Sequence, residues 1–406
     1  MSAHATPGSA PLSPSEAARL LARRVAPVGA ERIAWADAPG RVLAEKITLD
    51  RPSPACDVSA MDGYALTLKE PRGVRLAVSD EALPGRPPPT MPADGSVVRI
   101  FTGAPVPSGA TAVVQRELVE EDARSIVIPN DAEIFEGMHI RRKGENACRG
   151  ETVAEPGRTV SPGVMAALAS CGCSQVSVHR SLRVGVLVTG DEVLPVEATP
   201  DDWQLRDSNG PALLASLAPL EWVDEIELAR AHDDPDRLAS SAQHLLDLCD
   251  ALLITGGVSA GDHDHVPRVL RELGLEILFH KLALRPGKPA LGAITPDAKP
   301  VLGLPGNPVS VVTTARLLAL PALFARAGLV DPPRPTLVRV SAEKPAPPKL
   351  WWYPLVRLDE RGEATLAPSK GSGDWVAAAS ADGFVEVPPG EPASGLRPYF
   401  PFPNAL

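Results

Sequence analysis

The chain has 406 residues, of which 44% are hydrophobic and 22% are charged, a composition typical of globular proteins. This length is enough for two to four domains, each with a core of its own. The formal net charge of −10 argues against general binding to nucleic acids or to anionic membranes. An anionic substrate would therefore need a local cluster of Lys and Arg side chains.

Neither the cysteines nor the apolar stretches indicate an extracellular or membrane protein. Five cysteines do not form a disulfide framework, and Cys171 and Cys173 lack the second pair that a structural zinc site needs. Residues 1–20 contain no apolar core of a signal peptide. The most hydrophobic stretch, 309–329, is interrupted by Arg316 and by a proline, so it predicts a core helix. We therefore expect a cytoplasmic protein without a membrane or nucleic-acid partner.

The first half of the chain predicts mostly β structure. Residues 1–12 are expected to form a disordered tail, and a helix starts after Ser13, with Glu16 reaching back to the cap. From 31 to 180 the pattern changes to short strands separated by proline-rich turns. A second short helix is expected at 161–170. The expected strands are 42–49, 74–78, 96–100, 112–115 and 125–128.

These elements predict an N-terminal region at 13–182 that has two parts. An elongated stalk, formed by 13–45 and 147–182, would carry an inserted β-rich subdomain at 46–146. The stalk would then hold the subdomain away from the rest of the chain.

The second half predicts an α/β domain followed by a β domain. From 183 to 328, apolar strands alternate with helical patterns at 209–217 and 238–248, which predicts a doubly wound α/β domain. After a proline linker, residues 335–406 contain only strand-like runs, which predict a small β-barrel or sandwich. The expected fold class is therefore multidomain, α/β plus β.

Three buried strands of the predicted α/β domain end in residues suited to binding a ligand. One ends at Gly256-Gly257, a sharp turn that exposes backbone N–H groups, and the acids Asp262 and Asp264 follow it. A second ends in the sequence TGDE at 189–192. The third ends in PGNP at 305–308, where Asn307 can cap the following helix and leave N–H groups free for an anion. Each alone could be an ordinary strand-to-helix turn, but together they predict one crevice for a phosphorylated ligand at the carboxyl edge of a parallel sheet.

Seven motifs in one order resemble the molybdopterin molybdenumtransferases, the family of MoeA and the gephyrin E domain. The resemblance covers residues 13 to 400 approximately, nearly the whole chain. The motifs are SAMDGYA at 59–65, RIFTGAPVP at 99–107, TGDE at 189–192, DSNG at 207–210, TGGVSAGDHD at 255–264, KLALRPGKP at 281–289 and LPGNPVS at 304–310.

This resemblance implies a reaction, a metal and an assembly. The protein would insert molybdenum from molybdate into adenylylated molybdopterin and release AMP, with Mg²⁺ as the metal ion. It would work as an elongated homodimer whose active-site cleft is shared between the subunits. A molybdopterin adenylyltransferase and the maturation factors of molybdoenzymes are candidate partners.

The implied active site combines carboxylates with cationic side chains. Glu192, Asp233 and Asp264 are the candidate catalytic and metal-binding carboxylates, because Mg²⁺ takes oxygen ligands. Lys281 and Arg285 are candidate catalytic residues in a basic loop whose third cation, Lys288, is a candidate substrate ligand. A solvated basic loop without a ligand is the alternative.

The resemblance also brings Asp62 and Thr102 into the catalytic set. Alone, Asp62 would be an ordinary Asp-Gly turn, but in the family its motif faces the nucleotide domain of the partner subunit. Asp207 or Ser208 is expected to cap the helix at 209–217. The remaining candidate substrate-binding residues are Thr189, Gly190, Asp191, Ser208, Gly256, Gly257, Ser259, Pro305, Gly306, Asn307, Pro308 and Ser372.

Two positions depart from the family pattern. Asn146 stands where similar enzymes carry an acid, so it could ligate a metal only through its carbonyl and without charge. KLWWY at 349–353 stands where the family has a Gly-Arg pair, and we expect its aromatic residues to fill the core and rim of the last domain. Stacking on a pterin is the alternative role for them.

Three functions remain open from the sequence: the molybdenum insertase, another reaction of the same domain such as molybdopterin adenylylation, and a non-catalytic paralogue that binds molybdopterin or a protein. The adenylyltransferase alternative is weakened by the SAMDGYA and FTGAP segments, since a chain limited to the α/β domain would lack both.

Overall fold

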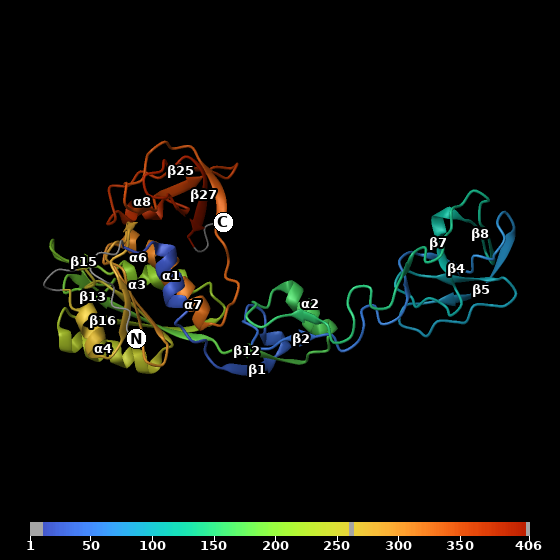
Figure 1. Cartoon of the computed structure of the whole chain (residues 1–406), viewed down its shortest axis with the longest axis horizontal. Coiled ribbons are helices and arrows are strands. Elements are labelled where there is room, and N and C mark those ends of the chain that lie inside the picture. The colour runs from blue at the N-terminus through green and yellow to red at the C-terminus, as the bar shows by residue number, and fades with distance from the viewer. Residues whose placement is uncertain (1–10, 260–263, 403–406) are drawn as a thin grey trace. The chain divides into compact units, whose positions relative to one another are not determined.

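The computed structural model describes residues 11–259 and 264–402, which form two compact units (Figure 1). We call Met1–Glu45, Pro156–Met165 and Gln175–Leu406 the main unit, and Lys46–Glu155 with Ala166–Ser174 the inserted unit. Asp262, one of the acids expected near the candidate site, lies outside the described residues.

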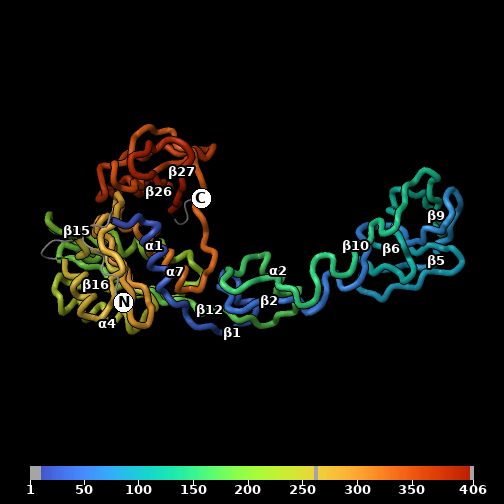
Figure 2. The backbone as a smooth tube through the Cα atoms, viewed as in Figure 1, coloured from blue at the N-terminus to red at the C-terminus, as the bar shows by residue number. Residues whose placement is uncertain are grey.

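A six-stranded sheet of order β7-β4-β6-β5-β9-β8 forms the inserted unit (Figure 2). Its two faces carry separate cores, because neighbouring strand residues point in opposite directions: Tyr64 packs with Leu76 and Val97, whereas Ala65 packs with Val98. Two short antiparallel pairs, β3–β10 and β2–β11, complete the unit. The bounds are β2 Ile47–Thr48, β3 Val58–Ser59, β4 Gly63–Leu66, β5 Arg75–Ala82, β6 Val97–Ile100, β7 Ala112–Gln115, β8 Glu120–Asp122, β9 Ser125–Val127, β10 Ile140–Arg141 and β11 Thr152–Ala154.

Four of the five strands expected in the first half are confirmed with small shifts of their ends, as β5, β6, β7 and β9. The prediction of one continuous strand at 42–49 is wrong. Val42 and Leu43 form isolated bridges to Thr159 and Val178, and only Ile47–Thr48 belongs to a ladder, with β11. The backbone therefore changes its pairing partner within this stretch, which periodicity cannot reveal.

The main unit contains a six-stranded sheet of order β16-β13-β17-β21-β20-β18. The first four strands are parallel, and β20 runs antiparallel to both of its neighbours, β21 and β18. The doubly wound α/β fold is confirmed, since helices α1 (Pro14–Ala22), α3, α6 (Pro308–Thr314) and α7 (Leu320–Arg326) share a core with one face and α4 and α5 with the other. The bounds are β13 Leu182–Thr189, α3 Asn209–Leu217, β16 Val223–Ala231, α4 Pro235–Leu248, β17 Ala251–Thr255, α5 Val266–Glu272, β18 Glu276–His280, β20 Leu291–Ile294 and β21 Pro300–Leu304.

Both helices expected in the first half are present. In α1 (Pro14–Ala22) the predicted capping box is confirmed, because Ser13 Oγ accepts from the Glu16 N–H and the Ser13 N–H donates to the Glu16 carboxylate. Helix α2 (Pro162–Ser170) starts after Ser161, whose hydroxyl accepts from Val164. Strands β1 (Ala30–Ala34) and β12 (Gln175–His179) pair antiparallel.

The most apolar stretch is the expected core helix, but it is irregular. It consists of α6 (Pro308–Thr314), a π-helical turn (Ala315–Ala319) and α7 (Leu320–Arg326). Pro321 has no N–H to continue the α-helical pattern, which accounts for the wider turn before it. By length and composition this helix could cross a membrane, but 72% of its most apolar window is buried inside the protein, as in a core helix.

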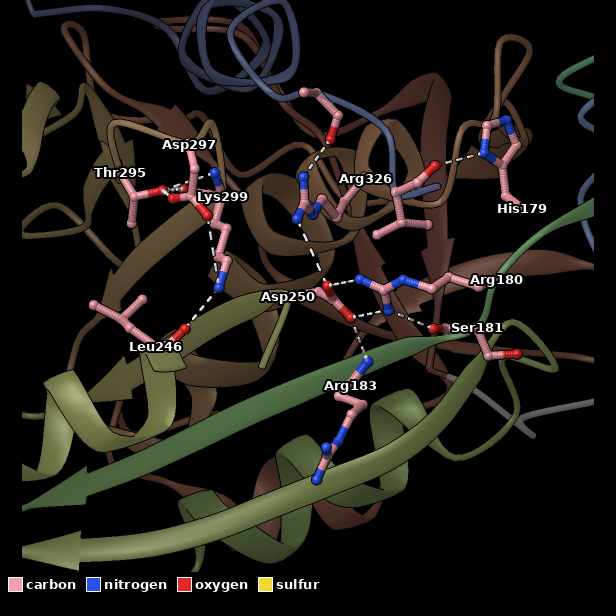
Figure 3. A network of polar contacts seen from close by, with 12 residues as sticks. His179, Arg180, Ser181, Arg183, Leu246, Asp250, Thr295, Asp297, Lys299 and Arg326 are labelled. Atoms are coloured by element: carbon pink, nitrogen blue, oxygen red, sulfur yellow. Dashed lines mark hydrogen bonds and ion pairs between the residues drawn. The ribbon is translucent and has the colours of Figure 1, made fainter. Parts of the chain in front are cut away.

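A buried carboxylate at the amino end of β17 ties together several elements of the main unit (Figure 3). Asp250, just before β17, accepts hydrogen bonds from the Arg180 guanidinium and the Arg183 N–H at 2.8 and 3.0 Å, and Arg326 at the end of α7 lies 3.6 Å away. Burial by itself raises the pKa of Asp250, but these hydrogen bonds and charges outweigh it and hold the pKa below its usual value. Arg326 also donates to the Ala26 carbonyl, which lies between α1 and β1.

The C-terminal β domain is a closed barrel of order β22-β25-β24-β26-β27. Of the two predicted alternatives, a barrel and a sandwich, the barrel is confirmed. The prediction for the aromatic run is confirmed: Tyr353 is 1% exposed and packs edge-on against Phe384, and Trp352 packs on the barrel core. The bounds are β22 Thr336–Val340, β23 Trp351–Trp352, β24 Leu355–Leu358, β25 Glu363–Leu366, α8 Trp375–Ala379, β26 Gly383–Val385 and β27 Gly395–Pro401.

Candidate active site

The carboxyl ends of β13, β17 and β21 meet at one edge of the sheet, as their order requires. They border a cavity of about 1050 Å³, which lies in the main unit. Most of the substrate-binding residues predicted from the sequence line this cavity. Of the predicted residues, those lining it are Thr189, Gly190, Glu192, Ser208, Asp233, Gly256, Gly257, Ser259, Asp264, Pro305, Gly306, Asn307 and Pro308.

Hydrogen bonds between the strand ends fix the floor of the cavity. The Thr189 hydroxyl donates to the Thr255 carbonyl at 3.3 Å, and the Gly256 N–H donates to Leu304 at 3.1 Å. Gly256 has φ +94°, and a Cβ there would lie 2.6 Å from the Thr189 hydroxyl, so only glycine fits. The strand ends are thus held too closely for any larger residue at this point.

Asn209, from the DSNG motif, joins two of these strand ends and was not predicted as a site residue. Its side-chain N–H groups donate to the Thr255 hydroxyl at 3.0 Å and to the Gly306 carbonyl at 2.7 Å. Its Oδ1 is buried without a hydrogen-bond partner. Asp207 accepts from the Gly210 N–H and so caps α3 as expected, whereas Ser208 makes no side-chain cap bond.

Three carboxylates gather at the ends of β13 and β16. Asp191 accepts from His232 Nδ1 at 2.8 Å and from the Asp233 N–H at 3.3 Å. Burial raises the pKa of Asp233, and the negative charges of Asp191 and Glu192 raise it further. The pKa of Asp191 is lowered, chiefly by its hydrogen bond from His232. A cation bound beside Asp233 would relieve this repulsion.

The prediction that Glu192, Asp233 and Asp264 together ligate a metal ion is not confirmed. Within residues 11–259 and 264–402, no three Asp, Glu, His or Cys side chains are placed to hold one. The donor set nevertheless fits Mg²⁺, which keeps several waters and needs only one or two carboxylates beside substrate phosphates.

The turn after β21 is hydrogen-bonded to Ser372, in the C-terminal β domain. Asn307 occupies the cap position of α6, but its side chain makes no cap bond, so that prediction is wrong. Its amide donates instead to the Ser372 hydroxyl at 3.0 Å, and the Val309 N–H donates to the Ser372 carbonyl at 3.0 Å. The predicted residue Ser372 is therefore held beside the cavity by two bonds to this turn.

The basic loop lies between β18 and β20 and does not line the cavity, apart from Pro289. Strand β19 (Leu284–Arg285) pairs with β23, and the Tyr353 N–H donates to the Arg285 carbonyl, so the aromatic run fixes the loop backbone. Lys281, Arg285 and Lys288 are exposed, and their side chains make no hydrogen bond or ion pair with other described residues. They are available to bind an oxyanion.

The other predicted residues belong to the inserted unit, each with partners inside that unit. Asp62 Oδ1 accepts from both the N–H and the hydroxyl of Thr102, each at 2.7 Å. Both bonds lower the pKa of Asp62, and the bond from the backbone N–H has the larger effect. Asp62 is therefore a carboxylate at neutral pH. Asn146 accepts from Arg141 and donates to the Ser53 hydroxyl, so both ends of its amide are engaged.

Sequence reasoning also missed Trp375, whose indole is 60% exposed and lines the cavity. The signal available in the sequence was the run of small residues before it, GSGD at 371–374, which predicts a turn that presents the next side chain.

Sequence comparisons agree with this domain organisation. Residues 12–172 match the MoeA N-terminal region (domain I and II), and residues 185–325 match a probable molybdopterin binding domain. The molybdopterin molybdenumtransferase of Synechococcus elongatus is 34% identical, over 89% of this chain and 91% of its own length. The enzyme of that name from Staphylococcus aureus strain MRSA252 is 31% identical, over 79% of this chain and 77% of its own.

Solved structures extend the likeness to the whole fold. A molybdopterin biosynthesis MoeA protein of Pyrococcus horikoshii is 28% identical, covers 96% of this chain and 99% of its own, and has a TM-score of 0.75. Another, from strain OT3, is 24% identical with a TM-score of 0.79 and supports the fold alone.

The fold and the cavity at its sheet edge define a multidomain enzyme of the MoeA-like class, with a molybdopterin-binding type of α/β domain. The chain belongs to the molybdopterin molybdenumtransferase family and takes part in molybdenum cofactor biosynthesis. The alternatives of an adenylyltransferase or a non-catalytic paralogue are not favoured, since the relatives match both the N-terminal region and the α/β domain.

Proposed function

We propose that the protein transfers molybdenum from molybdate to adenylylated molybdopterin, with release of AMP and with Mg²⁺ as cofactor. The observation that carries this proposal is the cavity of about 1050 Å³, which gathers residues from the TGDE, DSNG, TGGVSAGDHD and LPGNPVS motifs at one sheet edge. Its size is in the upper range of small-molecule sites, as a nucleotide-linked pterin requires.

Each group of side chains has a role that follows from its surroundings. Asp233 and Glu192 would hold Mg²⁺, which, when bound, neutralises the pyrophosphate and helps AMP to leave. The unpaired Lys281, Arg285 and Lys288 would bind phosphate or molybdate oxygens. Asn209 holds the strand ends that form the cavity floor in fixed register.

We further propose a cytoplasmic homodimer in which Asp62 and Thr102 of one chain complete the cavity of the other. Asp62 supports this, because its carboxylate is exposed, fixed by Thr102 and without a cation directly bound to it among the described residues. We expect light scattering at micromolar concentration to give twice the mass of one chain. A monomer at that concentration would contradict the shared site.

Asn146→Asp is expected to slow AMP release, because it adds a negative charge where we expect a dianionic substrate. The new carboxylate would still accept from Arg141, and the Ser53 hydroxyl could turn to donate to it instead of accepting, so the fold should remain. AMP release across a Mg²⁺ titration measures the effect, with neutral Asn146→Ser as the control. A strong gain of activity in the Asp variant would show instead that the natural chain has lost a metal ligand.

The function itself is tested by incubating the purified protein with adenylylated molybdopterin, Mg²⁺ and molybdate, and by following AMP. We expect AMP only when all three components are present. Release without molybdate would indicate a hydrolase, and formation of adenylylated molybdopterin from ATP would indicate an adenylyltransferase.

A further inference from the structure

Trp375 is unusual among the residues that line the cavity. It is the first residue of α8, its side chain is 60% exposed, and its neighbours on the cavity wall include Gly373, Asn307 and Pro308. Elsewhere the wall consists largely of glycines, prolines, carboxylates, amides and hydroxyls. A large apolar side chain left in water at such a place loses the burial that usually keeps tryptophan in a protein.

The backbone around Trp375 is fixed relative to the sheet edge. Asp374 accepts from the Lys370 N–H at 2.8 Å and from the Ala377 N–H at 3.1 Å, so it closes the turn and caps α8. Ser372 is bonded to Asn307 and to the Val309 N–H at the start of α6. The position of Trp375 on the cavity wall is therefore built by the fold.

Among the described residues, no other ring and no cation is stacked on the Trp375 indole. Across residues 11–259 and 264–402, its ring makes no aromatic or cation–π contact. A rigid, electron-rich ring is thus largely exposed on the wall of the cavity. Such a surface binds flat heteroaromatic rings by stacking, irrespective of their hydrogen-bonding pattern.

We propose that Trp375 is a substrate-binding residue that stacks on a fused two-ring heterocycle of the ligand. This inference rests on the proposed function, whose substrate carries two such groups, the adenine and the pterin. The carboxylates Glu192 and Asp233 line the same cavity, so the phosphates and any cation would be held by other residues than the ring. Trp375 would act on ring recognition alone.

Binding to the full-length protein can be measured by calorimetry with AMP, pterin-6-carboxylate and ribose 5-phosphate, which has the sugar phosphate without the base. Trp375→Ala is expected to weaken binding of at least one of the two ring compounds about tenfold. Trp375→Phe, which keeps a flat ring, should lose much less. Ribose 5-phosphate should bind the Ala variant and the natural protein alike.

The matched control is Trp35→Ala, because Trp35 is also half-exposed but lies in the 3₁₀ turn Trp35–Asp37, away from the cavity lining. If Trp375→Ala binds AMP more weakly but the pterin equally well, Trp375 stacks on the adenine. If it binds the pterin more weakly but AMP equally well, Trp375 stacks on the pterin. The proposal would be overturned if Trp375→Ala bound both ring compounds as tightly as the natural protein does. It would also be overturned if Trp35→Ala lost as much affinity for them, or if Trp375→Ala lost as much affinity for ribose 5-phosphate.

Measuring both ring binding and AMP release distinguishes a failure of the stacking role from a failure of the proposed function. If Trp375→Ala weakens ring binding while the natural protein releases no AMP from adenylylated molybdopterin, the stacking role stands and the insertase function fails. If AMP release is normal and Trp375→Ala changes neither ring affinity nor KM, the function stands and the stacking role fails.

Discussion

Asp250→Ala is expected to lower the free energy of unfolding of the main unit by about 3–5 kcal/mol, because it leaves the buried guanidinium of Arg326 without its counter-charge. Arg326 is 9% exposed and would lose its only ion pair among the described residues, while the Arg183 N–H would lose its acceptor. The midpoint of urea unfolding, followed by circular dichroism, measures the loss.

Asp297→Ala provides the matched control for this substitution. Asp297 lies in the same region (Figure 3) and pairs with Lys299 at 3.7 Å, but its side chain is 64% exposed. Solvent screens such a pair, so the expected cost is about 1 kcal/mol or less. Equal effects of the two substitutions would show that the Asp250 network does not stabilise the fold.

The Asp250 network also predicts how stability changes with pH. Its pKa is lower in the folded protein than in the unfolded chain, so the stabilisation is fully present above the usual carboxyl pKa. It is lost as the pH falls through the lowered value. Asp250→Ala should therefore flatten the acid side of the stability profile, and an unchanged acid limb would contradict this.

Asp233→Asn is expected to reduce AMP release by roughly 10- to 100-fold, the range typical of disrupted metal centres. The amide keeps the shape of the side chain but removes the charge that would attract Mg²⁺. Raising the Mg²⁺ concentration should recover part of the rate, which a purely structural role would not allow. Unchanged activity at low Mg²⁺ would exclude Asp233 from the metal site.

The same substitution should not destabilise the fold. Burial and two neighbouring carboxylates raise the pKa of Asp233, so the folded protein holds its proton more tightly than the unfolded chain does. Its ionisation therefore costs stability as the pH rises above the usual carboxyl range. At neutral pH, Asp233→Asn should leave the thermal midpoint unchanged or higher, so lost activity with retained stability would mark a functional residue.

Much of the fold could be predicted from local patterns because it depends on them. The strand ends at Thr189, Gly256 and Pro305 were recognisable, since a buried apolar run followed by glycine and polar residues is typical of a parallel sheet edge. Their convergence on one cavity follows from sheet order, which the structure confirms.

The contacts between sequence-distant residues could not be predicted in this way. Asn307 was assigned to its own helix cap, but its amide pairs with Ser372, 65 residues later. Similarly, the backbone changes from isolated bridges at Val42 and Leu43 to a ladder at Ile47–Thr48, and Asn209 joins two strand ends. Such partners are chosen by tertiary packing, which overrides local preference.

The transfer reaction itself is tested most directly by counting AMP and molybdenum in one experiment. The purified protein would be mixed with adenylylated molybdopterin, Mg²⁺ and molybdate, and the pterin product would then be separated and its metal content measured. Our account predicts about one molybdenum atom bound to pterin for each AMP released, and a parallel fall of both products, by roughly 10- to 100-fold, in Asp233→Asn. AMP release without molybdenum on the pterin, or no AMP release at all, would contradict it.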